Sequence, residues 1–277
     1  IFAQIAASAV GVTLDRVRVI TGDTGVTPYG GGTWASRGAG IGGEAVLLAG
    51  RALLSNILDI AAVILKLDKS ELDISGNAVI HKLTQETKLP LEELGRVAYF
   101  RPDTLPMDFQ SELTVTRHYT PRQYGFTFTN GIQASLVEVD IDTGFVKLLK
   151  HWCVEDSGTI INPMLVDEQL RGGVVQGIGA ALYEECLYSP EGQLLNGSMA
   201  DYLVPMSGEM PDIICAHVET PTLQSQLGAK GVGEAGTAGA PGAVMNAIND
   251  ALAPLGARVT AMPFTPERIL RALRKVA

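Results

Sequence analysis

A single carboxylate, Glu234, stands in a stretch of the chain that carries almost no other side-chain chemistry. The stretch reads KGVGEAGTAGAPGAVMNAINDAL and runs from Lys230 to Leu252. Glycine and alanine flank Glu234 on its two sides. A carboxylate that becomes poorly solvated once a ligand covers it is suited to accept a proton as a general base. The pattern therefore predicts base chemistry at Glu234.

The alternative role for Glu234 is structural. An acid in the first turn of a helix is stabilised by the positive end of the helix dipole. The run of small residues after Glu234 predicts that the next helix begins five or more positions further on. This spacing favours the catalytic interpretation, because the dipole acts only within about one turn of the helix end.

Three glycine-rich segments lead into apolar helices. The longest, TGDTGVTPYGGGTWASRGAGIGG, covers residues 21–43 and precedes a helix predicted over residues 44–65. Helix N-termini offer backbone N–H groups to anions, and glycine lets a large ligand approach the backbone. Together the segments favour a large, polar, phosphorylated cofactor. For any one segment, a simple turn of the chain remains the alternative.

Two of these segments match the pattern G-x-G-x-x-G, at residues 38–43 and 231–236. A dinucleotide site requires a strand directly before the glycines and an acid about 20 residues after them. Neither match has that context, and the chain contains no GxxxxGK[ST] motif. A nucleotide-binding module is therefore disfavoured.

Composition and charge narrow the class of protein. The chain has 277 residues, of which 46% are apolar and 18% charged, and its net charge is −9. It can bury a substantial core, and its acidic balance argues against a nucleic-acid partner. The longest apolar run, residues 61–67, is far shorter than the roughly 20 residues that span a bilayer. We expect a cytoplasmic protein without a membrane span.

Cysteine and histidine usage predicts no metal site made of protein ligands. Cys153, Cys186 and Cys215 are widely spaced, and no CxxC motif is present. Neither a disulfide framework nor an iron–sulfur or zinc site follows from this pattern. We expect three buried thiols and four scattered histidines with structural roles.

Strands and helices alternate irregularly, which predicts an α+β fold with mixed sheets and two lobes. The first predicted lobe is residues 1–110 and the second is residues 111–277. Within the first we expect a helix that ends at Gly11, a strand over 17–20, a largely buried helix over 44–65, a hairpin around Gly76 and Asn77, and a helix after Pro90. Because nothing caps the first helix, we expect a fragment or one subunit of a divided active region.

In the second lobe the clearest signal is a hairpin over residues 132–153. Its apolar residues alternate, and Asp142-Thr143-Gly144 supplies the turn. Further expected elements are a helix over 166–185, a hairpin over 186–195, a strand over 211–219, and a last helix capped by Thr265.

The motifs of this chain resemble those of the molybdenum hydroxylases, the group of xanthine dehydrogenase, aldehyde oxidase and aerobic carbon monoxide dehydrogenase. GDTGVTPYGGGTWASR resembles the first glycine loop of that family. VEVDIDTG, DSGTIINP, QLRGGVVQGIG and KGVGE follow in the order of the family. The resemblance covers nearly the whole chain and corresponds to the C-terminal part of the molybdopterin-binding large subunit.

The resemblance implies roles for individual residues. In the family, the glutamate of the GVGE motif lies beside the molybdenum without ligating it and acts as the general base, which corresponds to Glu234. Contacts to the molybdopterin are implied for Gln176 and for Ala35, Ser36 and Gly233. The dithiolene of the pterin holds the metal, so no protein ligand is expected.

The resemblance also implies cofactors and partners. The cofactor is molybdopterin with molybdenum, in its plain or its cytosine dinucleotide form, while iron–sulfur clusters and FAD belong to partner domains or subunits. Expected partners are the remainder of the molybdenum subunit or a second molybdopterin subunit, iron–sulfur and flavin subunits, and a small-molecule substrate. The role of Lys230 stays open, as does the choice among heterocycle, aldehyde and carbon monoxide as substrate.

The expected function is part of the active site of a molybdenum-dependent hydroxylase or dehydrogenase that oxidises a heterocycle, aldehyde or similar small molecule with water-derived oxygen. The alternative is a non-catalytic, cofactor-binding fragment that keeps the fold. The presence of Glu234, Gln176 and all three glycine-rich segments favours the enzyme.

Overall fold

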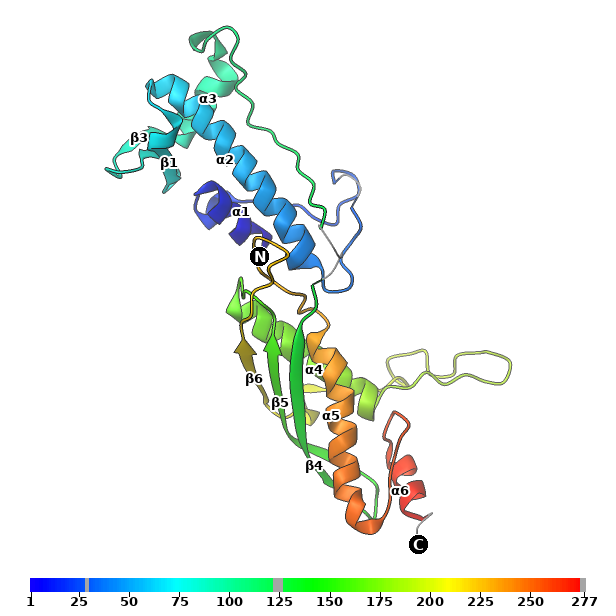
Figure 1. The fold of residues 1–277 in the computed structure, drawn as a ribbon. Coiled ribbons are helices and arrows are strands. Elements are labelled where there is room, and N and C mark those ends of the chain that lie inside the picture. Colours follow the sequence, from blue (N-terminus) through cyan, green and yellow to red (C-terminus); the bar gives the residue numbers. More distant parts are fainter. Residues whose placement is uncertain (28–29, 122–126, 275–277) are drawn as a thin grey trace. The chain divides into compact units, whose positions relative to one another are not determined.

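The structure is a computed structural model that describes residues 1–27, 30–121 and 127–274 (Figure 1). The chain forms two compact units. One comprises Ile1–Gly125 with Gln224–Leu227, and the other comprises Phe126–Leu223 with Gly228–Ala277. Helices and mixed sheets occur together, so the predicted α+β class is confirmed. The assignment of residues 1–110 and 111–277 to two molybdopterin-binding lobes stays a prediction.

Helices of the first unit follow the local sequence signals. They are α1 (Phe2–Val10), α2 (Glu44–Leu65) and α3 (Leu91–Phe100). As predicted, α1 ends at Gly11, whose φ of 89° is left-handed, and α3 begins directly after Pro90. The first two helices pack closely at Gly50, where an added Cβ would lie 2.6 Å from the Cβ of Ala9.

The first unit also holds a small antiparallel sheet. Its strands are β1 (Leu72–Ser75), β2 (Ala78–His81) and β3 (Thr87–Pro90), in that spatial order. The predicted hairpin around Gly76 and Asn77 is therefore confirmed, and β3 is an addition. Buried side chains such as Ile60, Leu72, Val79 and Leu94 form the core of this unit.

Two predictions for the first unit are wrong. Residues 17–20 are extended but form no strand, because they pair with no ladder and their apolar side chains are exposed, Val19 at 44% and Ile20 at 52%. The helix over 44–65 is less buried than expected. Seven of its residues are buried, namely Glu44, Leu47, Gly50, Ile57, Leu58, Ile60 and Ala61. Most of the others are half-buried, because this unit covers only part of the helix surface.

By length and composition alone, one helical stretch of the described residues could cross a membrane. It covers Gly38–Leu65, and a third of its most apolar window is buried. The apolar stretch of the chain is therefore longer than the run over residues 61–67.

The second unit contains a mixed three-stranded sheet. Its strands are β4 (Asn130–Val139), β5 (Val146–Asp156) and β6 (Ile213–Val218). The first two are antiparallel, and β6 runs parallel to β5. The predicted hairpin over 132–153 and the predicted strand over 211–219 are thereby confirmed.

Three helices belong to the second unit. They are α4 (Pro163–Leu182), α5 (Ala235–Leu252) and α6 (Pro266–Arg274). The N–H of Arg268 donates to Oγ1 of Thr265 at 3.4 Å, which confirms the predicted cap of α6. The helix predicted over 166–185 begins three residues earlier, since Asn162 caps it and Pro163 suits its first turn. The predicted hairpin over 186–195 is reduced to one bridge.

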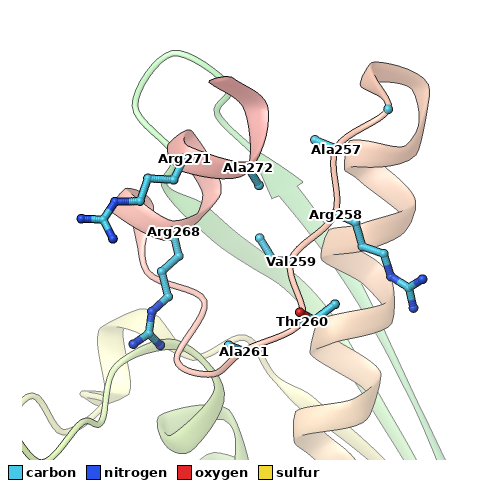
Figure 2. A pocket seen from close by; sticks show the side chains of 9 residues that line it. Ala257, Arg258, Val259, Thr260, Ala261, Arg268, Arg271 and Ala272 are labelled. Atoms are coloured by element: carbon cyan, nitrogen blue, oxygen red, sulfur yellow. The ribbon is translucent and has the colours of Figure 1, made fainter. Parts of the chain in front are cut away.

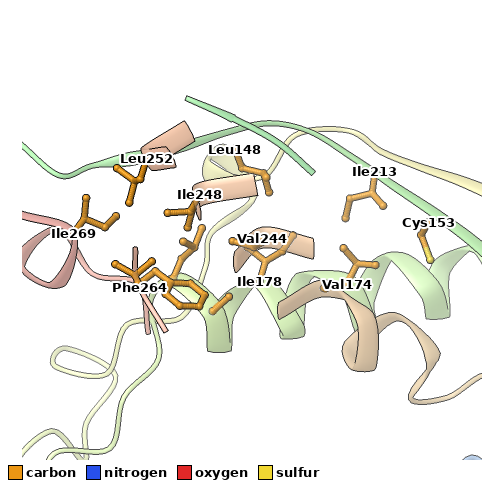
Figure 3. Close-up of a cluster of buried hydrophobic side chains, with 14 of the residues drawn as sticks. Leu148, Cys153, Val174, Ile178, Ile213, Val244, Ile248, Leu252, Phe264 and Ile269 are labelled. Atoms are coloured by element: carbon orange, nitrogen blue, oxygen red, sulfur yellow. The ribbon is translucent and has the colours of Figure 1, made fainter. Parts of the chain in front are cut away.

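A continuous apolar core lies between α4, α5 and the sheet (Figures 1 and 3). Val174 and Ile178 from α4 meet Val244 and Ile248 from α5, with all four side chains fully buried (Figure 3). This core fixes the position of both helices against the sheet and hence the place where α5 begins.

The three cysteines differ in exposure. Cys153 is buried, and burial together with nearby Glu155 raises the pKa of its thiol to about 12. Cys215 is half-buried, whereas Cys186 is exposed in the loop after α4. The prediction of three buried thiols is therefore confirmed for Cys153, met only in part by Cys215 and wrong for Cys186.

Candidate active site

The helices α4 and α5 cross through glycines whose backbones nearly touch. A Cβ added to Gly236 would lie 2.5 Å from the carbonyl oxygen of Leu170 and 2.7 Å from the amide nitrogen of Val174. One added to Gly177 would lie 2.8 Å from the Cβ of Ala240. Gly177 and Gly236 thus allow the two helices to pack closely. The motifs alone do not indicate this role.

One face of α4 holds the first turn of α5. Nε2 of Gln169 donates to the carbonyl of Gly233 at 2.9 Å. The hydroxyl of Thr237 lies 3.0 Å from the carbonyl oxygen of Gly173 and 3.2 Å from Oε1 of Gln176. The structure thus brings the predicted residues Gln176 and Gly233 together at this turn. Gln169 was not predicted, although its spacing of seven from Gln176 places both on one helix face.

Glu234 is the residue directly before α5, and it is exposed. The prediction that this helix starts five or more residues later is wrong. Small residues give weak helix signals in sequence, but packing against α4 allows the helix to begin at Ala235. Glu234 therefore also lies within reach of the helix dipole, and the spacing argument for catalysis no longer holds. The base role of Glu234 stays a prediction.

A buried ion pair anchors the loop before Glu234. Nζ of Lys230 lies 3.1 Å from Oδ2 of Asp156, the last residue of β5. Burial alone would raise the pKa of Asp156, but hydrogen bonds from the backbone of Gly158, from Thr220 and from Lys230 outweigh it and hold the pKa below its ordinary value. The amide of Lys230 also donates to the carbonyl of Ser157 at 2.8 Å. Lys230, whose role was left open, thus fixes the loop to the sheet.

The residues predicted in the first glycine loop have an unusual backbone. Ala35 and Ser36 have φ values of 51° and 54°, in the left-handed region that disfavours any residue with a Cβ. They follow Trp34, whose ring lies under the guanidinium of Arg37 at 4.7 Å. Strained backbone of this kind concentrates at functional segments. Ala35 and Ser36 belong to the first unit, whereas Gln176, Gly233 and Glu234 belong to the second.

The first unit buries a carboxylate that the sequence reading missed. Glu44, the first residue of α2, is fully buried, and its Oε1 accepts from the N–H of Leu227 at 2.6 Å. Its Oε2 has no hydrogen-bond partner among the described residues. The sequence signal for Glu44 was its place as an acid at the start of an apolar helix, directly after the segment GAGIGG. That segment forms a π-helix, Gly38–Gly43, and not the strand-to-helix turn of a dinucleotide site.

A hollow of about 380 Å³ lies between residues 256–261 and α6 (Figure 2). Three arginines line it, but Arg258 points away from the other two (Figure 2). Arg268 pairs with Glu185 at 2.6 Å, and Arg271 pairs with Glu267 at 2.7 Å. Because these partners already satisfy two of the cations, the hollow carries no functional assignment.

The donors around the start of α5 fit a polar organic cofactor. The amides of Gln169 and Gln176 lie on an exposed face of α4, and Gly172 between them has open space where a Cβ would be. A ligand can therefore approach this helix face closely, next to the N-terminus of α5. Within the described part of the chain, no group of three or more His, Cys, Asp or Glu side chains could hold a metal ion.

Comparison with known proteins identifies the family. Residues 1–211 match the model of the molybdopterin cofactor-binding domain. The chain is 36% identical to the large subunit of nicotine 6-hydroxylase from Paenarthrobacter nicotinovorans, over 99% of this chain and 33% of that protein. It is 31% identical to the carbon monoxide dehydrogenase large chain of Hydrogenophaga pseudoflava, over 99% of this chain and 34% of that protein.

Solved structures agree with this result. Quinoline 2-oxidoreductase from Pseudomonas putida 86 superimposes with a TM-score of 0.89 at 37% identity, over 99% of this chain and 34% of the other. A Cu,Mo-CO dehydrogenase superimposes with a TM-score of 0.87 at 30% identity, with the same coverage. The chain spans about one third of the length of these relatives. It therefore belongs to the molybdenum hydroxylases, as part of their molybdopterin cofactor-binding domain.

Proposed function

We propose that the chain forms one part of the active site of a molybdopterin-dependent oxidoreductase that hydroxylates a small molecule with water-derived oxygen. The observation that carries this proposal is the placement of Glu234. Its carboxylate is exposed at the start of α5, between a loop anchored by Lys230 and Asp156 and a helix face that presents Gln176. This arrangement holds the backbone around one ionisable group while leaving the group itself accessible.

The residues of the chain divide the work between binding and proton transfer. The molybdenum cofactor, when bound, supplies the two-electron oxidation. In the second unit, Gln176 and Gly233 would contact the cofactor, and in the first unit the same role is assigned to Ala35 and Ser36. Glu234, directly before α5, accepts the proton of the water-derived nucleophile.

A nitrogen heterocycle is the substrate class that we favour. Two relatives carry the names nicotine 6-hydroxylase and quinoline 2-oxidoreductase, and they are 36% and 37% identical to this chain. Carbon monoxide is the second candidate, because two carbon monoxide dehydrogenase large chains share 31% identity with this chain. The cytosine dinucleotide form of the cofactor, iron–sulfur and flavin partner subunits, and a cytoplasmic location belong to the same proposal.

The test is Glu234→Gln in the assembled holoenzyme, with molybdenum content measured first. Glutamine keeps the size of the side chain but cannot accept a proton. We expect full metal content. The rate at which substrate reduces the metal centre, measured by rapid mixing, should fall by about 100- to 10,000-fold. Glu267→Gln is the matched control, since it removes an acid from the first turn of α6. Reduction within about tenfold of the unmodified rate would exclude Glu234 as the base.

A further inference from the structure

A buried histidine of the second unit takes no part in the proposed chemistry. His151 of β5 is completely buried. Its Nδ1 lies 2.9 Å from the hydroxyl of Ser135, and its Nε2 lies 3.0 Å from Oε1 of Gln133, both on the neighbouring strand β4. Burial lowers the pKa of His151 to about 4, so the ring is neutral at pH 7.

Gln133 continues this chain of hydrogen bonds to α5. Its Nε2 donates to the carbonyl oxygens of Ala235 and Gly236, at 3.3 and 3.0 Å. Carbonyl oxygens only accept, so the amide NH2 must face them and Oε1 must face His151. The histidine therefore carries its proton on Nε2, and its Nδ1 accepts from the hydroxyl of Ser135.

The first turn of α5 depends on such outside support. Glu234 provides no side-chain cap to it, and Pro241 inside the helix lacks the N–H that would bond to the carbonyl of Thr237. The helix also makes room for Gln133, because a Cβ at Gly239 would lie 2.8 Å from Nε2 of that residue. Gly239 thus leaves the space that the Gln133 side chain occupies against the helix.

From this geometry we infer that His151 and Gln133 act as a positioning pair that fixes the first turn of α5 and thereby the backbone presenting Glu234. His151 holds the Gln133 amide in one orientation, and the amide ties the carbonyls of residues 235 and 236 to β4. Neither residue takes part in proton transfer. The catalytic consequence rests on the proposed function, whereas the structural consequence does not.

Hydrogen–deuterium exchange of the assembled holoenzyme tests the pair. The quantity measured is the ratio of amide exchange in peptides covering residues 235–240 to that in peptides covering residues 247–252, so that a general loss of stability cancels. Gln133→Met keeps the length of the side chain without its hydrogen bonds. We expect Gln133→Met and His151→Leu to raise the ratio about tenfold, as the loss of one or two hydrogen bonds implies.

Two further variants separate positioning from general destabilisation. His151→Gln retains an N–H donor toward Gln133, so the ratio should stay within about threefold of the unmodified enzyme. Asn249→Leu is the matched control on the same helix, since Asn249 also makes two hydrogen bonds to backbone, with Val259 at 2.9 and 2.8 Å. Because Asn249 lies in the reference segment 247–252, this variant should lower the ratio and not raise it.

The outcomes decide the inference without reference to turnover. A ratio within about twofold of the unmodified value in Gln133→Met would overturn it, as would an increase in His151→Gln equal to that in His151→Leu. Rates of reduction of the metal centre by substrate, measured in the same preparations, test the catalytic consequence. If Glu234→Gln leaves reduction unchanged, the proposed function fails while the exchange ratios still report on the pair.

Discussion

The ammonium group of Lys230 lies 3.1 Å from Oδ2 of Asp156, and the two side chains are only 14% and 10% exposed. The first residue opens the KGVGE motif and the second ends β5, so the pair ties the loop before Glu234 to the sheet. Oδ1 of Asp156 accepts from the amides of Gly158 and Thr220, each at 3.0 Å. The carboxylate thus remains fully bonded on both oxygens, as burial requires.

Replacement of Lys230 should destabilise the second unit strongly. Lys230→Met leaves Asp156 buried without its cation, and breaking such a pair costs about 3 kcal/mol. Lys88→Met is the matched control, because Lys88 pairs with Glu86 in a more exposed setting and its replacement should destabilise the protein far less. Urea unfolding of the holoenzyme measures the loss of stability in both variants. It is followed by hydrogen–deuterium exchange in peptides that cover β5 and the loop before Glu234. Equal effects of the two variants would contradict the role given to Lys230.

The same pair has a defined dependence on pH. The folded-state pKa of Asp156 lies below its ordinary value of 3.8, so its contribution to stability is present above that value and is lost as the pH falls through the folded-state pKa. In Lys230→Met the folded-state pKa should rise, and acid unfolding should then begin at a higher pH.

The crossing of α4 and α5 predicts opposite effects for two glycines of one helix. Gly236→Ala places a Cβ against backbone atoms of Leu170 and Val174, which cannot move aside cheaply. It should cost about 1–3 kcal/mol or more. Gly242→Ala meets nothing within 4 Å and should stabilise α5 by about 0.5–1 kcal/mol. Thermal unfolding of both variants checks the sign, and a neutral Gly236→Ala would refute the close crossing.

Local signals in the sequence were sufficient for several elements. The helix over 44–65 has its predicted bounds, because its long apolar run contains no proline and ends where Lys66 has a left-handed backbone. The hairpin of β4 and β5 followed from alternating apolar residues and a turn with a glycine at position 144, whose φ is 77°. The cap at Thr265 with Pro266 after it marked the start of α6.

Features that depend on packing could not be predicted. The start of α5 at Ala235 depends on contact with α4, which a run of glycine and alanine does not reveal. Gln133 lies about 100 positions from the carbonyls that it binds, and Lys230 is 74 positions from Asp156, so no local pattern connects either pair. Residues 17–20 have strand-forming side chains but no neighbouring strand.

For Gln176 we predict a role in retaining the cofactor more than in the chemistry. The side chain is exposed on α4, and its Oε1 lies 3.2 Å from the hydroxyl of Thr237, which also lies 3.0 Å from the carbonyl oxygen of Gly173. This contact orients the amide. The NH2 group supplies donors for a polar ligand beside the start of α5. Gln176→Ala should therefore leave a cofactor group unpaired and weaken binding by about 1–3 kcal/mol.

Molybdenum occupancy of purified holoenzyme, measured before and after dialysis, tests this role of Gln176. We expect lower occupancy in Gln176→Ala, with the reduction rate per bound molybdenum close to that of the unmodified enzyme. Gln193→Ala is the control, because Gln193 is exposed in the loop between the bridged residues Tyr188 and Leu194. Full occupancy combined with a collapsed rate would instead place Gln176 in the chemical step. Thr237→Val should lower occupancy in the same direction but less, since it removes the group that orients the amide and leaves the amide itself in place.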